Sequence, residues 1–186
     1  MKVLLHICCG ACASSVAERL MCEGHRVTSF FYNPNIHPVD EYERRLKAVQ
    51  EVARQLGFDL VAGPYDRQRW FEMVKGQEYA PEGGARCKIC FEMRLRKTYE
   101  YLSKNMFDAF TTTLTVSPLK DVTLVNALGR EIGGDRFICA DFKKKGGFER
   151  ATKLALEWKL YRQNYCGCIY SLENALARKD RGSNDR

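Results

Sequence analysis

The sequence predicts an α/β protein with one mostly parallel sheet that is covered by helices on both faces. Short, continuous apolar segments alternate along the chain with longer segments whose apolar residues recur at helical spacing. The chain has 186 residues and an ordinary composition, which suits a single domain with a substantial core. We expect one domain over residues 1–178 and a polar tail over residues 179–186.

The first five segments establish the alternation. Residues 2–8 (KVLLHIC) are short and apolar, as in a buried strand, and residues 13–24 (ASSVAERLMCEG) begin with serines and end with glycine, as in many helices. Residues 26–32 (RVTSFFY) are β-branched and aromatic and predict a second strand. Two prolines make residues 33–38 a loop. Residues 39–57 then predict a long helix between a proline and a glycine.

The middle of the chain continues this pattern. Residues 58–63 (FDLVAG) predict a third strand, and residues 66–76 and 91–104 predict helices. The segment between these two helices, GQEYAPEGGARCKIC, is expected to be a loop. Residues 108–114 (DAFTTTL) predict a fourth strand, and residues 124–133 (LVNALGREIG) predict the helix that follows it.

The last segments complete the predicted fold. Residues 136–142 (RFICADF) predict a fifth strand and residues 148–162 a helix. Residues 166–168 (CGC) predict a turn, and a short helix is expected near residues 169–178, before the frayed tail. Ligands bind beyond the C-terminal ends of parallel strands, so segments that follow strands are expected to form the site.

Cysteine is the most informative residue type. The chain has nine, an odd number, and seven of them fall in three clusters: Cys8, Cys9 and Cys12; Cys87 and Cys90; Cys166 and Cys168. No apolar run approaches the ~20 residues of a membrane span, and the N-terminus lacks the features of a secretory signal, so we expect a cytoplasmic protein. In a reducing compartment, clustered cysteines favour metal or redox chemistry over structural disulfides.

Cys87 and Cys90 have the Cys-x-x-Cys spacing, whose sulfurs can reach one metal centre. The spacing alone leaves zinc, an iron–sulfur cluster and a redox pair open. A structural zinc site usually has a second such pair or a histidine pair, and adjacent Cys8 and Cys9 are a poor half-site for zinc. Thiolates from separated segments serve an iron–sulfur cluster well.

Cys166 and Cys168 are separated by a single glycine. That spacing is tight for chelating one metal, and a disulfide across it closes a small ring that is easily reduced, which suits a two-electron shuttle. Cys12 is open to three interpretations: a ligand, a nearby thiol or part of a helix start. Cys22 and Cys139 are interpreted as small hydrophobic residues.

Charged residues suggest further contacts. With 30 basic and 23 acidic residues, the net charge of +7 suits a polyanion such as tRNA, or a solvated basic surface. Asp121 and Asp141 follow predicted strands and are candidate proton donors, although helix capping is an alternative for each. Three adjacent lysines beside two glycines are candidates for phosphate contacts or form a mobile basic loop: Lys143, Lys144 and Lys145.

Two histidines are candidates for a role at the site: one lies in the first predicted strand near Cys8, and the other lies in the proline-rich loop. Strand alternation directs His6 to the same face as Cys8, and a core histidine with hydrogen-bond partners is the favoured interpretation. His37 lies in the proline-rich loop, where substrate contact is an alternative to a structural role.

Several motifs together resemble the QueH family of epoxyqueuosine reductases, cobalamin-independent enzymes of tRNA queuosine biosynthesis. They are HICCGAC, YNPNIHP, RCKICFEMRL, FTTTLTVSP, ADFKKKGG and YRQNYCGCIYS, and they cover residues 4 to about 171. The resemblance implies a Rossmann-like fold and a [4Fe-4S] cluster, and it leaves open an additional iron. It implies that the cluster ligands are Cys8, Cys9, Cys87 and Cys90. It also implies a redox-active disulfide between Cys166 and Cys168.

The resemblance further implies the reaction and its partners. The epoxide of epoxyqueuosine, at the wobble position of a tRNA, would lose its oxygen as water and become the alkene of queuosine. The reaction requires an electron donor, which the sequence does not identify. No interaction with a membrane is expected. Two alternatives remain: an ATP-dependent iron–sulfur tRNA-thiolating enzyme and a zinc-binding RNA adaptor. Against the first, CCGACAS stands where such enzymes have an SGGxDS-like loop; against the second, the cysteine spacing is poor for zinc.

Overall fold

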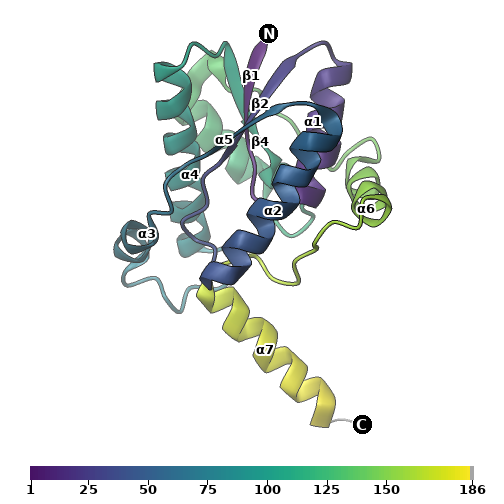
Figure 1. The fold of residues 1–186 in the computed structure, drawn as a ribbon. Coiled ribbons are helices and arrows are strands. Elements are labelled where there is room, and N and C mark those ends of the chain that lie inside the picture. Colours follow the sequence, from purple (N-terminus) through teal and green to yellow (C-terminus); the bar gives the residue numbers. More distant parts are fainter. Residues whose placement is uncertain (185–186) are drawn as a thin grey trace.

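The computed structural model describes the backbone of residues 1–184 and side chains up to residue 178. At its centre is a parallel sheet with the strand order β3-β2-β1-β4 (Figure 1). The strands are β1 (Lys2–His6), β2 (Arg26–Phe31), β3 (Asp59–Ala62) and β4 (Ala109–Thr112). This is the order in which a Rossmann-type sheet begins, so the predicted fold class is confirmed.

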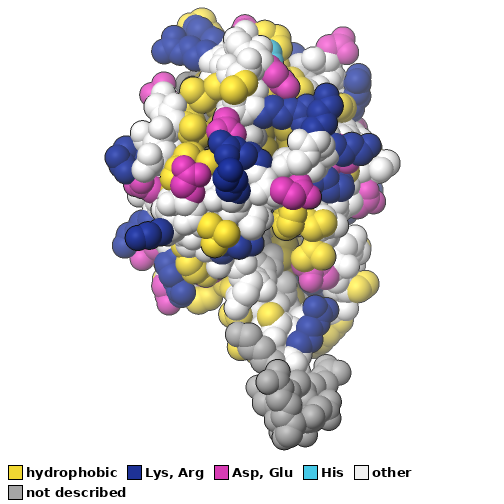
Figure 2. All heavy atoms as spheres, turned by 90° about the vertical axis from the view of Figure 1, so that its right-hand side faces the viewer, with side chains coloured by type: hydrophobic (Ala, Val, Ile, Leu, Met, Phe, Trp, Pro, Cys, Tyr) yellow, Lys and Arg dark blue, Asp and Glu magenta, His cyan; other side chains and the backbone are white. Residues whose placement is uncertain are grey.

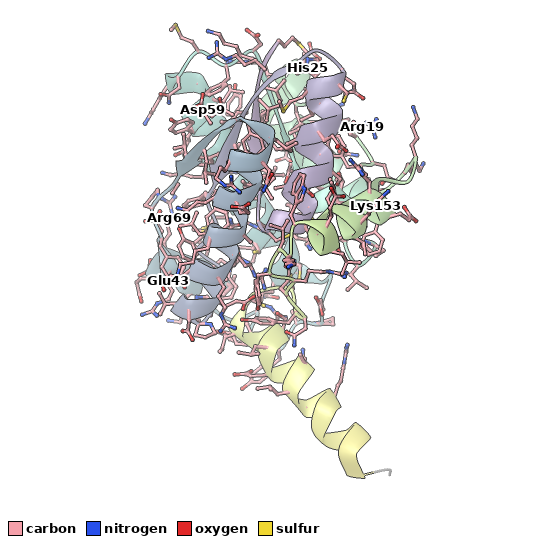
Figure 3. All side chains as sticks on the ribbon, turned by 45° about the vertical axis from the view of Figure 1, so that its right-hand side comes forward. Arg19, His25, Glu43, Asp59, Arg69 and Lys153 are labelled. Carbon is pink, nitrogen blue, oxygen red and sulfur yellow. The ribbon has the colours of Figure 1, made fainter. Side chains whose placement is uncertain are left out.

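Helices cover both faces of the sheet. Helices α1, α2 and α6 share one hydrophobic cluster with the sheet, and α3, α4 and α5 share another. The helices are α1 (Gly10–Cys22), α2 (Val39–Leu56), α3 (Arg67–Val74), α4 (Ala85–Lys104), α5 (Val122–Gly133), α6 (Gly147–Glu157) and α7 (Ile169–Asn184). Figure 3 shows α6, which carries Lys153, beside α1, which carries Arg19. Within residues 1–184, no helix has the length and apolar character needed to cross a membrane.

Strand β1 is buried on both sides, as a central parallel strand must be. Val3 and Leu5 pack into the cluster with α1 and α2, whereas Leu4 packs into the cluster with α4 and α5. The strand ends at His6, so Cys8 and Cys9 lie in the short loop before α1. That loop opens at the C-terminal edge of the sheet, from which α7 projects away from the body (Figure 1).

The predicted fifth strand over residues 136–142 is wrong. This segment has only one bridge among the described residues, between Phe137 and Phe110. The side chain of Asn126 donates to the Ala140 carbonyl and accepts from the Ala140 N–H, both at 3.3 Å. A side chain therefore occupies the backbone groups that a strand would use for its ladder.

Several helix boundaries also differ from the prediction: α1 begins at Gly10 and not at residue 13, and α6 ends at Glu157 and not at residue 162. Helix α4 begins at Ala85, directly after Gly84, so Cys87 and Cys90 lie in its first turns and not in a loop. Gly84 is the N-cap of α4 and has an extended backbone, so the helix begins earlier than the pattern of apolar residues predicts. Helix α7 continues to Asn184, past the end expected near residue 178. Residues 185–186 of the predicted tail lie outside the described residues.

Gly10 allows α1 to start close against α2. A methyl group there would lie 2.9 Å from both the Cβ and the carbonyl oxygen of Ala48. We expect Gly10→Ala to lower the free energy of unfolding by about 1–3 kcal/mol, because two helices must separate. Adding Ala48→Gly should recover only part of the loss, since the carbonyl remains. Urea unfolding of both single variants and the double variant measures this coupling, and a Gly10→Ala variant as stable as wild type would contradict it.

Candidate active site

The fold gathers the three cysteine clusters at the C-terminal edge of the sheet. Loop β1–α1 supplies the first cluster, the start of α4 the second, and the segment before α7 the third. Four cysteines belong to one hydrophobic cluster of buried residues: Cys8, Cys9, Cys90 and Cys168. Cys12 and Cys87 are partly buried against the same cluster. Segments far apart in the sequence therefore contribute thiols to one region.

A cavity of about 330 Å³ opens beside these cysteines. The sulfur-bearing residues in its wall are Cys8, Cys12 and Cys166. Its polar wall includes Lys120, which follows β4, and Asn174, which lies on α7. The volume is within the range of small-molecule sites, and the wall combines thiols, cations and amides.

A second, much smaller chamber of about 10 Å³ adjoins the first. Its lining residues are Asn35, Trp70, Arg86, Cys87, Cys90, Phe91, Arg94, Cys166 and Cys168. Because Cys166 lines both spaces, it stands in the wall between the chamber and the larger cavity.

The buried thiols hold their protons at neutral pH. Burial raises the pKa of Cys90 to about 11. A hydrogen bond with Cys12 is the main cause that raises the pKa of Cys9 to about 11, and the Cys9 side chain together with burial raises the pKa of Cys8. Burial also raises the pKa of Cys87. A metal that takes these sulfurs as ligands must therefore displace protons.

Two cations face the thiols. Arg94 is 2% exposed, and its electrostatic partners are thiols, foremost those of Cys90 and Cys8. Lys120, which is half-buried, faces Cys166 and Cys8. Positive charge beside thiols favours their anionic, metal-binding form. Within the described part of the chain, however, no three Cys, His, Asp or Glu side chains already stand in a metal-holding group.

A buried ion pair holds the backbone around the Cys-Gly-Cys turn. Arg45 on α2 is 1% exposed and donates to Glu41 at 2.7 Å. Its two terminal nitrogens donate to the carbonyl oxygens of Cys166, at 2.9 Å, and Tyr165, at 3.1 Å. Gly167, at the centre of the turn, has φ +132°, which few other residues adopt. Arg45 thus fixes a main-chain segment that carries two thiols.

Replacing Arg45 should be far more costly than replacing its neighbour. We expect Arg45→Gln to lower the free energy of unfolding by about 3–5 kcal/mol, because it leaves Glu41 as a buried charge without its partner. Arg44→Gln is the matched control on the same helix: Arg44 pairs with Asp40 at 3.7 Å and is 53% exposed, so about 0–1 kcal/mol is expected. Chemical denaturation measures both values, and equal losses would show that the buried Arg45–Glu41 pair contributes no more stability than the exposed Arg44–Asp40 pair.

The two predicted proton donors have structural partners. Asp121 is the N-cap of α5 and accepts from the N–H groups of Thr123, at 2.8 Å, and Leu124. Asp141 forms ion pairs with Lys143, at 3.0 Å, and Lys144, at 3.9 Å. Among the described residues, neither carboxylate lines either cavity. A proton-donor role for them remains a prediction.

His6 and His37 are both buried. His6 contacts the Thr112 hydroxyl at 2.9 Å and the Tyr32 carbonyl at 3.2 Å, and burial lowers its pKa to about 3. His37 is 4% exposed and stacks on Phe71, with its pKa lowered to about 4 mainly by burial. His6 is therefore the core histidine that the sequence predicted, and the His37 side chain is turned away from solvent.

Several residues that surround the thiols have no distinctive signal in the sequence. The sequence pattern gives no reason to separate three of them from other residues of amphipathic helices: Arg45, Arg94 and Trp70. Spacing gave a partial signal, because Arg45 follows Glu41 by four residues and Arg94 follows Cys90 by four, so each pair shares a helix face. Burial of these side chains depends on the packed fold, and the local pattern does not contain it.

The fold and the site define a class: α/β proteins with a thiol-lined cavity at the C-terminal edge of a parallel sheet. A family model described as epoxyqueuosine reductase QueH matches residues 3–174. The chain belongs to this family of oxidoreductases.

Curated relatives agree with the family model. The chain is 40% identical to epoxyqueuosine reductase QueH of Haemophilus influenzae over 94% of this chain and 73% of the relative. It is 35% identical to the protein of the same name from Thermotoga maritima, over 91% of this chain and 90% of the relative. A crystal structure of a predicted subunit of tRNA methyltransferase from Methanocaldococcus jannaschii is similar in fold, with a TM-score of 0.52 and 18% identity over 84% of this chain and 77% of that chain.

Proposed function

We propose that this protein reduces epoxyqueuosine in tRNA to queuosine. The observation that carries the proposal is the thiol set: six cysteines from three segments line two adjoining cavities, and Cys9 is buried in the hydrophobic cluster beside them. The family is named for this reaction. Removing the epoxide oxygen takes two electrons and two protons, and thiols are the redox-active side chains that line the larger cavity.

Cys166 and Cys168 are proposed to supply the electron pair. Two thiols become one disulfide and release two electrons and two protons, while the epoxide becomes an alkene and its oxygen leaves as water, so atoms and electrons balance. Cys166 lines the larger cavity, where the nucleoside would bind. An external donor, not yet identified, must then reduce the disulfide. Reversible use of such a pair requires a readily reduced bond, which the tight spacing favours.

Cys8, Cys9, Cys87 and Cys90 are proposed to hold a [4Fe-4S] cluster, which when bound supplies single electrons. Three observations support this ligand set. The four thiols lie in, or pack against, one cluster of buried hydrophobic residues. Arg94 provides positive charge beside thiols of this set, and the wall of the small chamber has N–H donors without acceptors. The residues present thus fit an anionic sulfur-rich group.

Asp121 and Asp141 stay in the proposal as proton donors. The larger cavity contributes a different set of polar groups around the bound base: Lys120, Arg162 and Asn164. Their proposed task is to bind and orient the nucleoside beside Cys166 and to exclude water from the reacting bond.

Anaerobic turnover tests the proposed function. Purified protein is reconstituted with iron and sulfide, incubated with tRNA that bears epoxyqueuosine and a chemical reductant, and the nucleosides are analysed by mass spectrometry. We expect queuosine to appear at the expense of epoxyqueuosine. Zinc at one atom per chain, together with an unchanged nucleoside, would instead indicate a binding protein.

Basic residues near the larger cavity are proposed to contact the tRNA backbone. Figure 2 shows Lys and Arg side chains spread over one face among acidic ones, without a single dominant patch. Lys144 and Lys145 are exposed just before α6, whose residues Phe148 and Thr152 line the cavity. A local group of lysines beside the cavity is therefore a better candidate than the face as a whole.

Glutamine at Lys143, Lys144 and Lys145 together is expected to weaken tRNA binding. The slope of log affinity against log salt should also flatten by about 0.7–0.9 for each phosphate that the protein no longer neutralises. A matched control replaces three exposed lysines elsewhere with glutamine, so that both triple variants have the same net charge. These lysines are Lys47, Lys75 and Lys104. Filter binding over a range of salt concentrations measures both slopes. Equal slopes in the two triple variants would show that only total charge matters.

A further inference from the structure

The wall of the small chamber contains a set of buried polar atoms without hydrogen-bond partners. Four of its lining residues contribute one such atom each: Trp70 Nε1, Arg86 Nε, Arg94 Nη2 and Asn35 Oδ1. Three of the four are N–H donors. Buried donors in folded proteins nearly always have an acceptor, so three at one site need a physical explanation.

The surroundings of Trp70 offer its indole N–H no oxygen acceptor among the described residues. The side chain is 1% exposed and packs among the rings of His37, Phe71 and Tyr170. Trp70 lines the small chamber together with the thiols of Cys87 and Cys90. The neighbouring group that this N–H can serve is therefore sulfur.

Arg94 presents a second donor to the same space. Its Nε donates to the carbonyl oxygen of Cys90 at 3.0 Å, which fixes the guanidinium on α4, while Nη2 has no partner in the described structure. The electrostatic partners of this buried cation are thiols, whereas the equally buried Arg45 has a carboxylate partner. A buried guanidinium without a carboxylate is expected where an anionic group will be bound.

We propose that Trp70 and Arg94 are positioning residues that donate N–H hydrogen bonds to sulfur atoms of the iron–sulfur group bound at Cys87 and Cys90. This inference rests on the proposed function. Reduction adds negative charge to such a group, and N–H donors aimed at its sulfurs stabilise the reduced form. The two side chains thereby raise the reduction potential without themselves binding iron.

Trp70→Phe is the most direct test, because it keeps an aromatic ring and removes the N–H. The matched control is Trp158→Phe, which removes the other indole of the chain at the end of α6, in the opposite hydrophobic cluster. The reduction potential of the reconstituted protein is measured by anaerobic titration followed by absorbance and electron paramagnetic resonance. We expect Trp70→Phe to make reduction about tenfold less favourable, which is about 59 mV for one electron, and Trp158→Phe to change nothing.

Arg94→Gln and Arg94→Lys provide a second, independent arm. Loss of the positive charge in the glutamine variant should lower the potential more than the lysine substitution, which keeps the charge. Arg150→Gln, which removes a partly exposed arginine paired with Glu18, is the control. Wild-type potentials in the Trp70 and Arg94 variants, with iron and sulfide retained, would overturn this inference and leave the proposed function standing. A wild-type chain that takes up no iron and sulfide would overturn both.

Discussion

Alanine at any one of Cys8, Cys9, Cys87 or Cys90 is expected to impair cluster assembly and to reduce turnover by more than about 100-fold. Loss of a residue that only supports a metal ligand already lowers metal affinity or activity by about 10–100-fold. Each residue contributes a thiol to the region at the end of β1 or the start of α4. Four thiolates are needed for a [4Fe-4S] cluster, and an alanine leaves one iron without its protein ligand. The measurement is iron and acid-labile sulfide per chain, together with queuosine formation.

Cys22→Ala and Cys139→Ala are the controls for this series. Both cysteines are exposed, and neither lines a cavity in the described structure. They should retain full iron, sulfide and activity. A Cys8, Cys9, Cys87 or Cys90 variant that also kept all three would have to be removed from the ligand set.

Serine at Cys166 or Cys168 is expected to have a different effect: full cluster content with loss of multiple turnover. Serine preserves size but cannot form the disulfide, so the pair can no longer cycle between dithiol and disulfide. Multiple turnover should fall by about 100-fold or more, on the scale of losing one essential catalytic group. Iron analysis and steady-state product formation on the same sample separate the two functions.

Two outcomes would change the assignment of the cysteines. The small chamber brings Cys166 and Cys168 beside Cys87 and Cys90, so loss of iron from either serine variant would make that cysteine a metal ligand. Full activity of both variants with a chemical reductant would instead limit the pair to a relay for the physiological donor.

The sheet and the gathering of the cysteines were predictable because both follow from short-range pattern and from topology. Buried strands such as residues 2–6 are apolar throughout, and parallel strands place all their C-terminal ends at one edge. Three cysteine clusters that follow or precede such elements are therefore close in space. Strand β1 pairs in parallel with both β2 and β4, so the ends of these three strands lie side by side.

The parts that were not predictable depend on side chains that meet across the fold. Residues 136–142 have strand composition, yet Asn126 engages the backbone of Ala140 and ends the ladder. Arginine is usually exposed, so nothing local distinguishes buried Arg94 from exposed Arg96 two residues later. Likewise, only the packed structure shows that Trp70 faces a chamber lined by thiols.

The position of the Cys-Gly-Cys turn in the chain has a consequence for biosynthesis. All four strands and the Cys8, Cys9, Cys87 and Cys90 thiols lie within residues 2–112, whereas Cys166 and Cys168 come much later. A chain made from its N-terminus can complete the sheet and α2 before the turn leaves the ribosome. The turn can then dock onto Arg45, whose terminal nitrogens bind backbone carbonyl oxygens and therefore do not depend on the side chains of the turn. The scaffold and four of its thiols can thus form first, and the segment with Cys166 and Cys168 can be added last.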